Sequence, residues 1–461
     1  MTETTAINDF YRTTFEQCGQ EGFLDQPEAV RQMRHSAMDR FVQLGFPTTR
    51  MEAWRNTSVE PVAALEFHLP VEASPIDPRT IEPFSLRDSF QAMVAGGRLV
   101  PDQLPHDGLP QGVVIRGLAD ALKRIPEQVL PHLGRYADFN EQAFVALNTA
   151  FLSDGVFIQV PEGTLLKQPI HVIYLSTHAT ALVNHNSQLP IITHPRTLVV
   201  AGDNSRLTVI EHYVSLSGGT RLTEANGGLT FTNAVTEITA GAGSIVDYVR
   251  VQQESDDAAH IATVQTHQES DSQVGMHTIT IGGKLVRNDV NTILAGEGAE
   301  VAMNGLYLVK GRQHVDNHTR IDHAAPNCTS TENYRGIMDD RGHGIFNGRI
   351  VVHPKAQKTN ATQSNRNMML SDTAMVNTDP QLEIYADDVK CTHGSTVGQI
   401  DEETMFYFLS RGIDRETARR LLIHGFTQEI ISRIEADSVR MSVDKLVSQW
   451  LPDGQDSINV S

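Results

Sequence analysis

The residues best suited to chemistry are Cys391 and His393, which lie two positions apart in a short extended segment near the end of the chain. Alternate residues of a strand point to one face, so we expect the thiol and the imidazole to lie side by side, with Val389 on the same face. A thiolate and an imidazole together can bind a soft metal ion or accept a sulfur atom. Two ligands do not complete a metal site, so another segment or a partner chain would have to supply the others.

A structural role is the alternative for both residues. Free cysteine is among the most buried residue types, and Val389 beside it favours a core position for Cys391. His393 precedes Gly394, which we expect to end the last strand and to leave the imidazole nearer to solvent. The other histidines of this region follow no metal-ligand spacing, and hydrogen-bonded positions in strands or turns explain them.

Two pairs of aspartates allow a different hypothesis. Asp339 and Asp340 form one pair, and Asp387 and Asp388 form the other. Carboxylates on adjacent coils of a β-solenoid can act as general acid and base on a glycosidic bond, so the alternative function is a carbohydrate-active hydrolase or lyase. Adjacent aspartates are also typical of turns, and a chain with only two tryptophans offers few platforms for sugar rings.

Motifs for nucleotide hydrolysis and for metal-dependent hydrolysis are missing. The nearest approach to a phosphate-binding loop has Leu285 where a magnesium-binding hydroxyl is needed and Thr278 where the first glycine belongs. If nucleotide energy is used, another chain has to supply it.

The long stretch that must position Cys391 and His393 reads as β-structure. From about residue 155 to 395, short alternating runs are separated by Gly, Asn and Asp turns. Turns of small residues precede strands at 201–205, 240–244 and 295–299, a pattern typical of stacked coils. We therefore predict a mainly β fold built around a β-solenoid, in which each coil contacts its neighbours.

Helical patterns flank the β-region on both sides. We predict a helical and irregular region over 1–150, a β-solenoid core over 151–399 and a helical region over 400–461. Within the first part, frequent prolines and weak periodicity indicate an irregular stretch over 60–115.

Capping residues divide the carboxyl-terminal region into three predicted helices. Asp401 and Asp414 are the predicted N-caps of the first two, and Gly412 and Gly425 are their predicted ends. The third helix is expected to begin at Thr427.

The composition limits the classes of partner. The chain has 56 acidic and 37 basic residues and a formal net charge of -19, which disfavours nucleic acid and anionic membranes because both need a cationic face. The amino terminus lacks the features of a signal peptide, and no apolar run is long enough to span a bilayer. Three widely spaced cysteines fit a reducing, cytoplasmic environment.

Three segments near the end of the β-region carry a resemblance to a known family. The stretch from Asp387 to Glu403, the following Phe406 to Ile413 and the preceding Lys358 to Leu370 closely resemble the SufB/SufD family of iron–sulfur cluster assembly proteins. Gly394, where SufB typically has an acidic residue, and the segment from Pro47 to Trp54 resemble the SufD branch of that family.

The resemblance covers about residues 140–435 and implies a right-handed parallel β-helix between two helical regions. It also implies a non-catalytic scaffold subunit of the SUF system, which pairs with SufB through the β-helix and docks the ATPase SufC through its carboxyl-terminal helices. A homodimer in the absence of these partners, and a purely structural subunit without metal contact, remain open alternatives.

The resemblance also implies roles for single residues. His393 matches a SufD histidine at the SufB interface, near the place where a cluster forms, and is the expected metal ligand. Cys391 matches the position of an essential SufB cysteine that is thought to matter less in SufD. No cofactor is expected to stay bound to this chain alone, and iron, sulfide or an iron–sulfur cluster would be shared transiently with SufB. The expected SufC-docking residues are Asp401, Met405, Phe406, Phe408, Leu409, Arg411, Leu421, Leu422 and Phe426.

Overall fold

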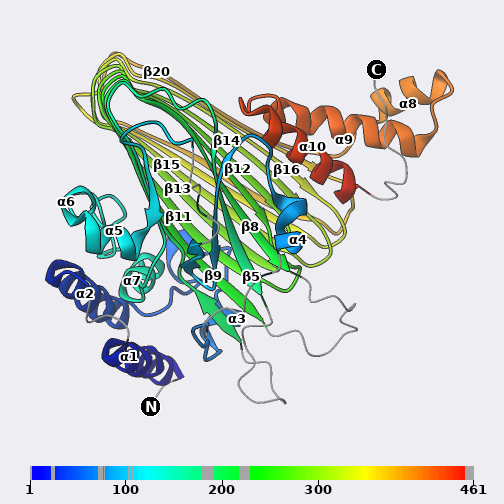
Figure 1. The fold of residues 1–461 in the computed structure, drawn as a ribbon. Helices are drawn as coiled ribbons and strands as arrows, with labels where there is room; N and C mark the ends of the chain where they lie inside the picture. Colours follow the sequence, from blue (N-terminus) through cyan, green and yellow to red (C-terminus); the bar gives the residue numbers. More distant parts are fainter. Residues whose placement is uncertain are drawn as a thin grey trace.

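The computed structural model describes residues 3–21, 26–70, 76, 78–101, 104, 108–177, 190–216 and 229–451. In this part of the chain two long sheets face each other and form a β-solenoid, with helices packed against its two outer faces (Figure 1). All strand pairs within the two sheets are parallel except one antiparallel pair at the first end of each sheet. The predicted parallel β-solenoid between helical regions is confirmed.

Each coil contributes one strand to each sheet. Sheet I consists, in spatial order, of β2 (Arg98–Leu99), β1 (Phe90–Ala95), β5 (Ile170–Thr177), β8 (Arg206–Leu216), β10 (Ile245–Gln253), β12 (Gln273–Ile281), β14 (Glu300–Val309), β16 (Thr329–Met338), β18 (Asn360–Met369) and β20 (Lys390–Gly398). Sheet II consists of β19 (Met375–Ile384), β17 (His343–Val352), β15 (His314–His323), β13 (Leu285–Leu294), β11 (Ala259–Gln268), β9 (Thr230–Ala240), β7 (Arg196–Ala201), β4 (Val156–Val160) and β3 (Val114–Gly117), with β6 (Ile191–Thr193) beside β9.

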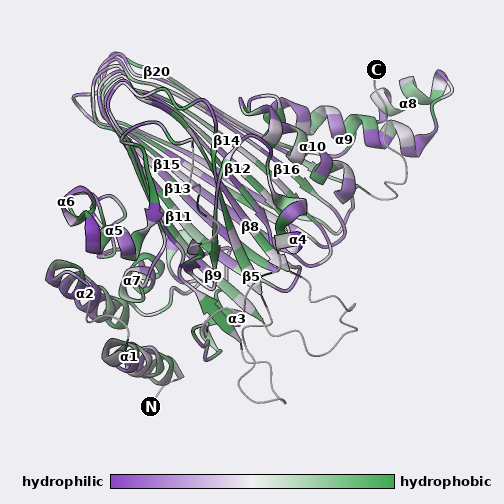
Figure 2. Ribbon diagram, in the orientation of Figure 1, coloured by the Kyte–Doolittle hydropathy of each residue, from purple (hydrophilic) through white to green (hydrophobic). Residues whose placement is uncertain are grey.

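The coils stack in strict register. Glu300 pairs with Gln273 on one side and with Thr329 on the other, and the following residues of β14 continue in the same order. One coil takes about 30 residues, which is a usual length for a solenoid repeat. Alternate side chains of each strand point into the interior and outward, and Figure 2 shows the resulting mixture of hydrophobic and hydrophilic positions along the strands.

Tight turns stack along the edge where sheet II leads into sheet I. Asn204, Asp271 and Asn327 adopt φ values of 54 to 59° there, a left-handed conformation that Asn and Asp tolerate better than most residues. Their backbone N–H groups donate to the turn of the next coil, for example from Asn204 to the carbonyl of Ala242 at 2.8 Å. The recurring turns of small residues in the sequence are these corners.

The interior is closely packed between the sheets. Apolar side chains fill it from Phe90 to Ala386. Two glycines make room for tyrosine rings of neighbouring coils: a Cβ at Gly305 would lie 2.1 Å from the ring of Tyr334, and a Cβ at Gly336 would lie 2.3 Å from the ring of Tyr307. These coils therefore have no spare volume.

The helices cover opposite outer faces of the solenoid, as Figure 1 shows. Most amino-terminal helices lie on sheet II, where Phe41 of α2 (Glu28–Leu44) shares a hydrophobic cluster with Phe231 and Leu285. The exception is α4 (Pro78–Ile81), whose Ile81 packs with Ile173 of sheet I. The carboxyl-terminal helices share a separate hydrophobic cluster with sheet I, in which Ile430 of α9 (Arg415–Ile431) packs together with Val251. The helices are α1 (Glu3–Glu21), α2 (Glu28–Leu44), η1 (Glu52–Trp54), α3 (Glu60–Ala63), α4 (Pro78–Ile81), η2 (Glu82–Phe84), α5 (Leu118–Arg124), α6 (Pro126–Val129), α7 (Ala143–Ala150), α8 (Glu402–Ser410), α9 (Arg415–Ile431) and α10 (Asp437–Trp450).

The prediction of an irregular stretch over 60–115 is wrong in part. β1 pairs in parallel with β5 from Phe90 to Ala95 and so extends sheet I, while β3 lies antiparallel to β4 at the end of sheet II. The local sequence does not reveal these strands, because the partners that hold them lie far along the chain and strand formation depends strongly on such context.

Two further boundaries differ from the prediction. Gly394 lies inside β20, which continues to Gly398 because its backbone pairs with β18 along its whole length. Gly425 lies inside α9, so the two helices expected from Asp414 and Thr427 are one helix, whose buried residues before and after the glycine hold it on sheet I.

Both predicted N-caps are present in the carboxyl-terminal region. Asp401 accepts a hydrogen bond from the backbone N–H of Thr404, and Asp414 accepts one from that of Thr417. Residues 452–461, the tail of the predicted region, lie outside the described residues. Among the helices of the described ranges, none is long and apolar enough to cross a membrane.

Candidate functional site

The last coil of the solenoid has a free edge in both sheets. Within the described strands, β20 pairs with β18 alone and β19 pairs with β17 alone, so each presents unpaired backbone N–H and C=O groups along its other side. Large apolar side chains are exposed around these edges. They are Met375, Ile384, Tyr385 and Val397. We call β19, β20 and their free edges the open coil.

Cys391 lies near the start of β20 and is half-buried. It pairs in register with Ala361 of β18 and packs against the hydrophobic interior of the solenoid. Burial raises the pKa of the Cys391 thiol, although a hydrogen bond with the backbone of Ala361 lowers it somewhat. The isolated chain therefore favours the neutral thiol, and a thiolate would need a metal ion or another positive charge beside it.

His393 follows two positions later on the same inward-facing side of β20 and is exposed, because no further coil covers it within the described residues. Its in-register neighbour is Gln363 of β18. One step beyond, the Ser395 hydroxyl lies 2.7 Å from the Thr378 hydroxyl of β19, so the two open strands meet across the interior. Cys391 and His393 thus lie together at the uncovered mouth of the solenoid.

The two side chains form an incomplete set of metal ligands. Among the described residues, no group of three or more His, Cys, Asp or Glu side chains is placed to hold a metal ion. Sulfur and imidazole nitrogen are the donor types that suit iron and iron–sulfur clusters. The open coil therefore fits such a cargo only with donors from outside the part of the chain that the structure describes.

The aspartate pairs lie at opposite edges of the solenoid. Asp339 and Asp340 occupy the turn from β16 to β17, where Asp340 has a φ of 52° and accepts a hydrogen bond from the backbone N–H of Gly311 at 3.1 Å. Asp387 and Asp388 occupy the turn from β19 to β20. These residues are turn formers, and the distance between the two edges prevents them from acting together on one glycosidic bond.

The predicted docking residues on α8 divide into supporting and exposed ones. Met405 is buried and Asp401 caps the helix, so both stabilise α8 itself, while Phe408 is half-buried. Phe406 is 71% exposed. The other exposed residues of the predicted set are Leu409, Arg411 and the capping residue Asp401. Tyr407, which the prediction omitted, is also 54% exposed, and the guanidinium of Arg411 lies 4.4 Å from its ring.

The predicted docking residues on α9 are less accessible. Leu421, Leu422 and Phe426 are half-buried. The guanidinium of Arg335 on β16 lies 4.6 Å from the ring of Phe426, and Arg335 also donates to the Phe426 carbonyl at 3.1 Å and forms an ion pair with Glu429. Phe426 therefore helps to fasten α9 to sheet I.

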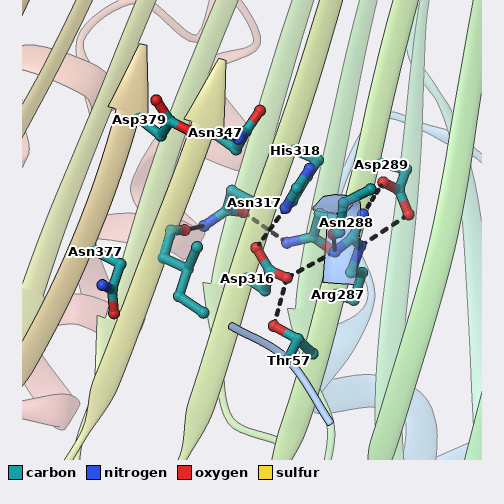
Figure 3. Close-up of polar contacts among 12 residues, drawn as sticks. Thr57, Arg287, Asn288, Asp289, Asp316, Asn317, His318, Asn347, Asn377 and Asp379 are labelled. Atoms are coloured by element: carbon teal, nitrogen blue, oxygen red, sulfur yellow. Dashed lines mark hydrogen bonds and ion pairs between the residues drawn. The ribbon is translucent and has the colours of Figure 1, made fainter. Parts of the chain in front are cut away.

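A polar groove of about 870 Å³ on the outer face of sheet II is a candidate region that the sequence analysis missed. Its floor consists of outward-facing side chains of β13, β15, β17 and β19, and one wall is the segment 47–56. Figure 3 shows the polar contacts of this floor, where Arg287 donates to Asp289 and Asp316, each at 2.8 Å. The Arg287 guanidinium also lies 4.0 Å from the ring of Trp54, and Thr57 donates to Asp316.

These contacts hold the tryptophan-containing segment rigidly against sheet II. Arg287 donates to the carbonyl of Ala53 at 2.6 Å, across a sequence separation of 234 residues. The sequence distinguishes the segment from Pro47 to Trp54 by its resemblance to the SufD branch, but no local pattern could identify a partner so far away.

Comparison with known proteins agrees with this architecture. Residues 182–426 match the model of the SUF system FeS cluster assembly SufBD core domain, and residues 5–172 match that of the SufBD protein N-terminal region. An iron–sulfur cluster assembly SufBD family protein of Synechocystis is 32% identical over 418 residues, which are 90% of each chain. The iron–sulfur cluster assembly protein SufD of Escherichia coli is 28% identical over 440 residues, 94% of this chain and 95% of its own length. SufD of Bacillus subtilis is 27% identical over 317 residues, 67% of each chain.

The matched family regions include the open coil with Cys391 and His393, as well as α8 and most of α9. The chain therefore belongs to the SufBD family of iron–sulfur cluster assembly proteins and is SufD-like.

Proposed function

We propose that this protein is a non-catalytic scaffold subunit, which pairs through its open coil with a SufB solenoid and docks the ATPase SufC through its carboxyl-terminal helices. The observation that carries the proposal is the open coil itself, with two free strand edges beside an incomplete set of ligands. A second solenoid stacked on β19 and β20 would pair with their unpaired backbone groups and bring its own donors beside Cys391 and His393.

Iron, sulfide or a nascent cluster would be the cargo of this shared site. The exposed imidazole of His393 is available to bind iron directly. Cys391, whose burial favours the neutral thiol, would bind only where iron stabilises the thiolate, with release of a proton. Because the donors are divided between two chains, a movement that separates the chains would weaken the site and release the cargo.

The exposed face of α8 would be the principal contact for SufC. Phe406, Tyr407 and Leu409 offer apolar side chains on a helix with a fixed N-cap, and such rigid aromatic residues are typical anchors of interfaces. The contacts of Arg335 with α9 connect this region to β16, which lies two strands from the free edge of sheet I. A movement of α8 and α9 on ATP hydrolysis would thus act close to the open coil.

The proposal is tested by co-expression of the chain with SufB and SufC, followed by size exclusion with light scattering and anaerobic cluster assembly. His393→Ala should leave the complex intact and abolish cluster assembly, and His35→Ala, a change of an exposed histidine on α2, should have no effect. A chain that stays alone in the presence of both partners, or a His393→Ala complex that assembles clusters normally, would contradict the proposal.

A further inference from the structure

Four inward-facing positions line up across the last coils of sheet I. They are Met303 on β14, Glu332 on β16, Gln363 on β18 and His393 on β20, each paired in register with the next. Adjacent strands are about 4.8 Å apart, so Gln363 is the immediate neighbour of His393 on the interior side. Glu332 and Gln363 are 0% and 1% exposed, respectively. The proposed ligand is thus backed by two buried polar side chains.

Glu332 fixes the orientation of the Gln363 amide group. Gln363 Nε2 donates to Glu332 Oε2 at 2.7 Å. A carboxylate can only accept hydrogen bonds, so an ionised Glu332 requires the NH2 group of Gln363 to face it and the amide oxygen to face away. That oxygen, Gln363 Oε1, is buried and has no hydrogen-bond partner among the described residues.

The space around the amide group is shaped by the opposite sheet. A Cβ at Gly348 of β17 would lie 2.3 Å from Gln363 Nε2, so only glycine allows the amide its observed place. An unpaired buried carbonyl oxygen is unfavourable unless a donor joins it in another state of the protein. The imidazole of His393 is the neighbouring side chain with an N–H group to offer.

We propose that Gln363 is a positioning residue for His393. Its amide oxygen accepts a hydrogen bond from the imidazole N–H when the other ring nitrogen binds iron. Glu332 holds the Gln363 amide in the orientation that this hydrogen bond requires. The inference rests on the proposed role of His393 as a ligand. A metal-binding histidine generally donates its second N–H to a fixed acceptor, which sets its tautomer and orientation, and loss of the acceptor lowers metal affinity by roughly 10- to 100-fold.

The experiment compares variants in the reconstituted complex with SufB and SufC at pH 8, where Glu332 is ionised. The first measurement is the rate at which an iron chelator removes the assembled cluster. The second is the pulsed EPR spectrum of the cluster in a complex in which only this chain contains ¹⁵N-histidine, which gives the couplings of the cluster to the histidine nitrogens. Gln363→Met, which removes the acceptor but keeps the length of the side chain, should accelerate cluster loss at least about tenfold and alter the nitrogen couplings. Gly348→Ala, which displaces the amide, should act in the same direction.

A double variant separates positioning from a merely structural role. Exchange of the two side chains by Glu332→Gln with Gln363→Glu keeps the charge, the volume and the mutual hydrogen bond, and it again directs an acceptor oxygen toward His393. It should therefore restore cluster retention to the wild-type rate, and it carries the test if circular dichroism shows that Gln363→Met fails to fold.

The possible failures are distinguishable. If His393→Ala loses the cluster while Gln363→Met retains it at the wild-type rate with unchanged nitrogen couplings, this inference is wrong and the proposed function stands. If His393→Ala retains the cluster as well, the proposed function itself is wrong.

Discussion

Glu332→Gln should stabilise the chain at neutral and alkaline pH. Burial raises the pKa of Glu332 to about 7, and the hydrogen bond from Gln363 offsets only part of this effect. A glutamate in the unfolded chain has a pKa of about 4.3, so between these two values the folded chain binds a proton that the unfolded chain releases. The stability that Glu332 contributes is therefore complete below about pH 4 and is lost as the pH rises through about 7.

The expected magnitude follows from the difference between the two pKa values. The pKa of Glu332 is higher in the folded than in the unfolded chain by between about 2 and 3. At 1.36 kcal/mol for each pKa unit, this difference corresponds to about 3 kcal/mol of unfolding free energy. Glutamine has the same shape and accepts the hydrogen bond of Gln363 without a charge. We compare the free energy of unfolding of Glu332→Gln with that of the wild type at each pH. The difference in favour of the variant should be about 3 kcal/mol larger at pH 8 than at pH 4.

Urea unfolding followed by circular dichroism at several pH values between 4 and 8 measures this difference. The comparison must be between variant and wild type at each pH, because buried histidines act in the opposite direction. Burial lowers the pKa of His194 to about 3 and the pKa values of His212, His314 and His323 to about 4, so these groups remove stability as the pH falls below about 6.5. A difference between variant and wild type that is constant across the range would refute the reasoning.

Three further changes test the packing and the docking surface. Asp316→Asn should lower the free energy of unfolding by about 3–5 kcal/mol, because Arg287 loses a buried charged partner; an unchanged urea midpoint would show that Asp289 alone suffices. Gly305→Ala should lower it by about 1–3 kcal/mol and reduce the melting temperature, because its methyl group would overlap the ring of Tyr334. Phe406→Ala should leave the melting temperature unchanged but weaken SufC binding in calorimetry, whereas Met441→Ala, a change of a 67% exposed residue on α10, should affect neither.

Those parts of the fold that depend on local chemistry could be predicted from the sequence. The turns around Asn204 and Asn327 combine small residues with residues that tolerate a positive φ, and such turns recur wherever sheet II leads into sheet I. Asp401 and Asp414 lie at the N-cap positions expected from their side-chain chemistry. The pairing of Cys391 and His393 on one strand follows from their spacing, but their roles remain predictions.

Tertiary contacts decided the points at which the sequence misled. Glycine disfavours regular structure by only about 1 kcal/mol, so pairing with β18 carries β20 through Gly394, and packing on sheet I carries α9 through Gly425. The contact between Arg287 and the segment of Trp54 joins elements that no local pattern connects. Glu332 and Gln363 are equally hidden in the sequence, because they become neighbours only when the coils stack in register.

Glu332 lowers the stability of the chain above neutral pH, and a buried glutamine would provide the same shape without that effect. Residues that reduce stability are typically retained where their chemistry is needed. An amide at position 332 could face Gln363 in either orientation, so the acceptor oxygen would face His393 about half of the time, and cluster retention would fall by about twofold. A Glu332→Gln variant that is more stable but retains its cluster less well would therefore indicate that the buried carboxylate serves the site rather than the fold.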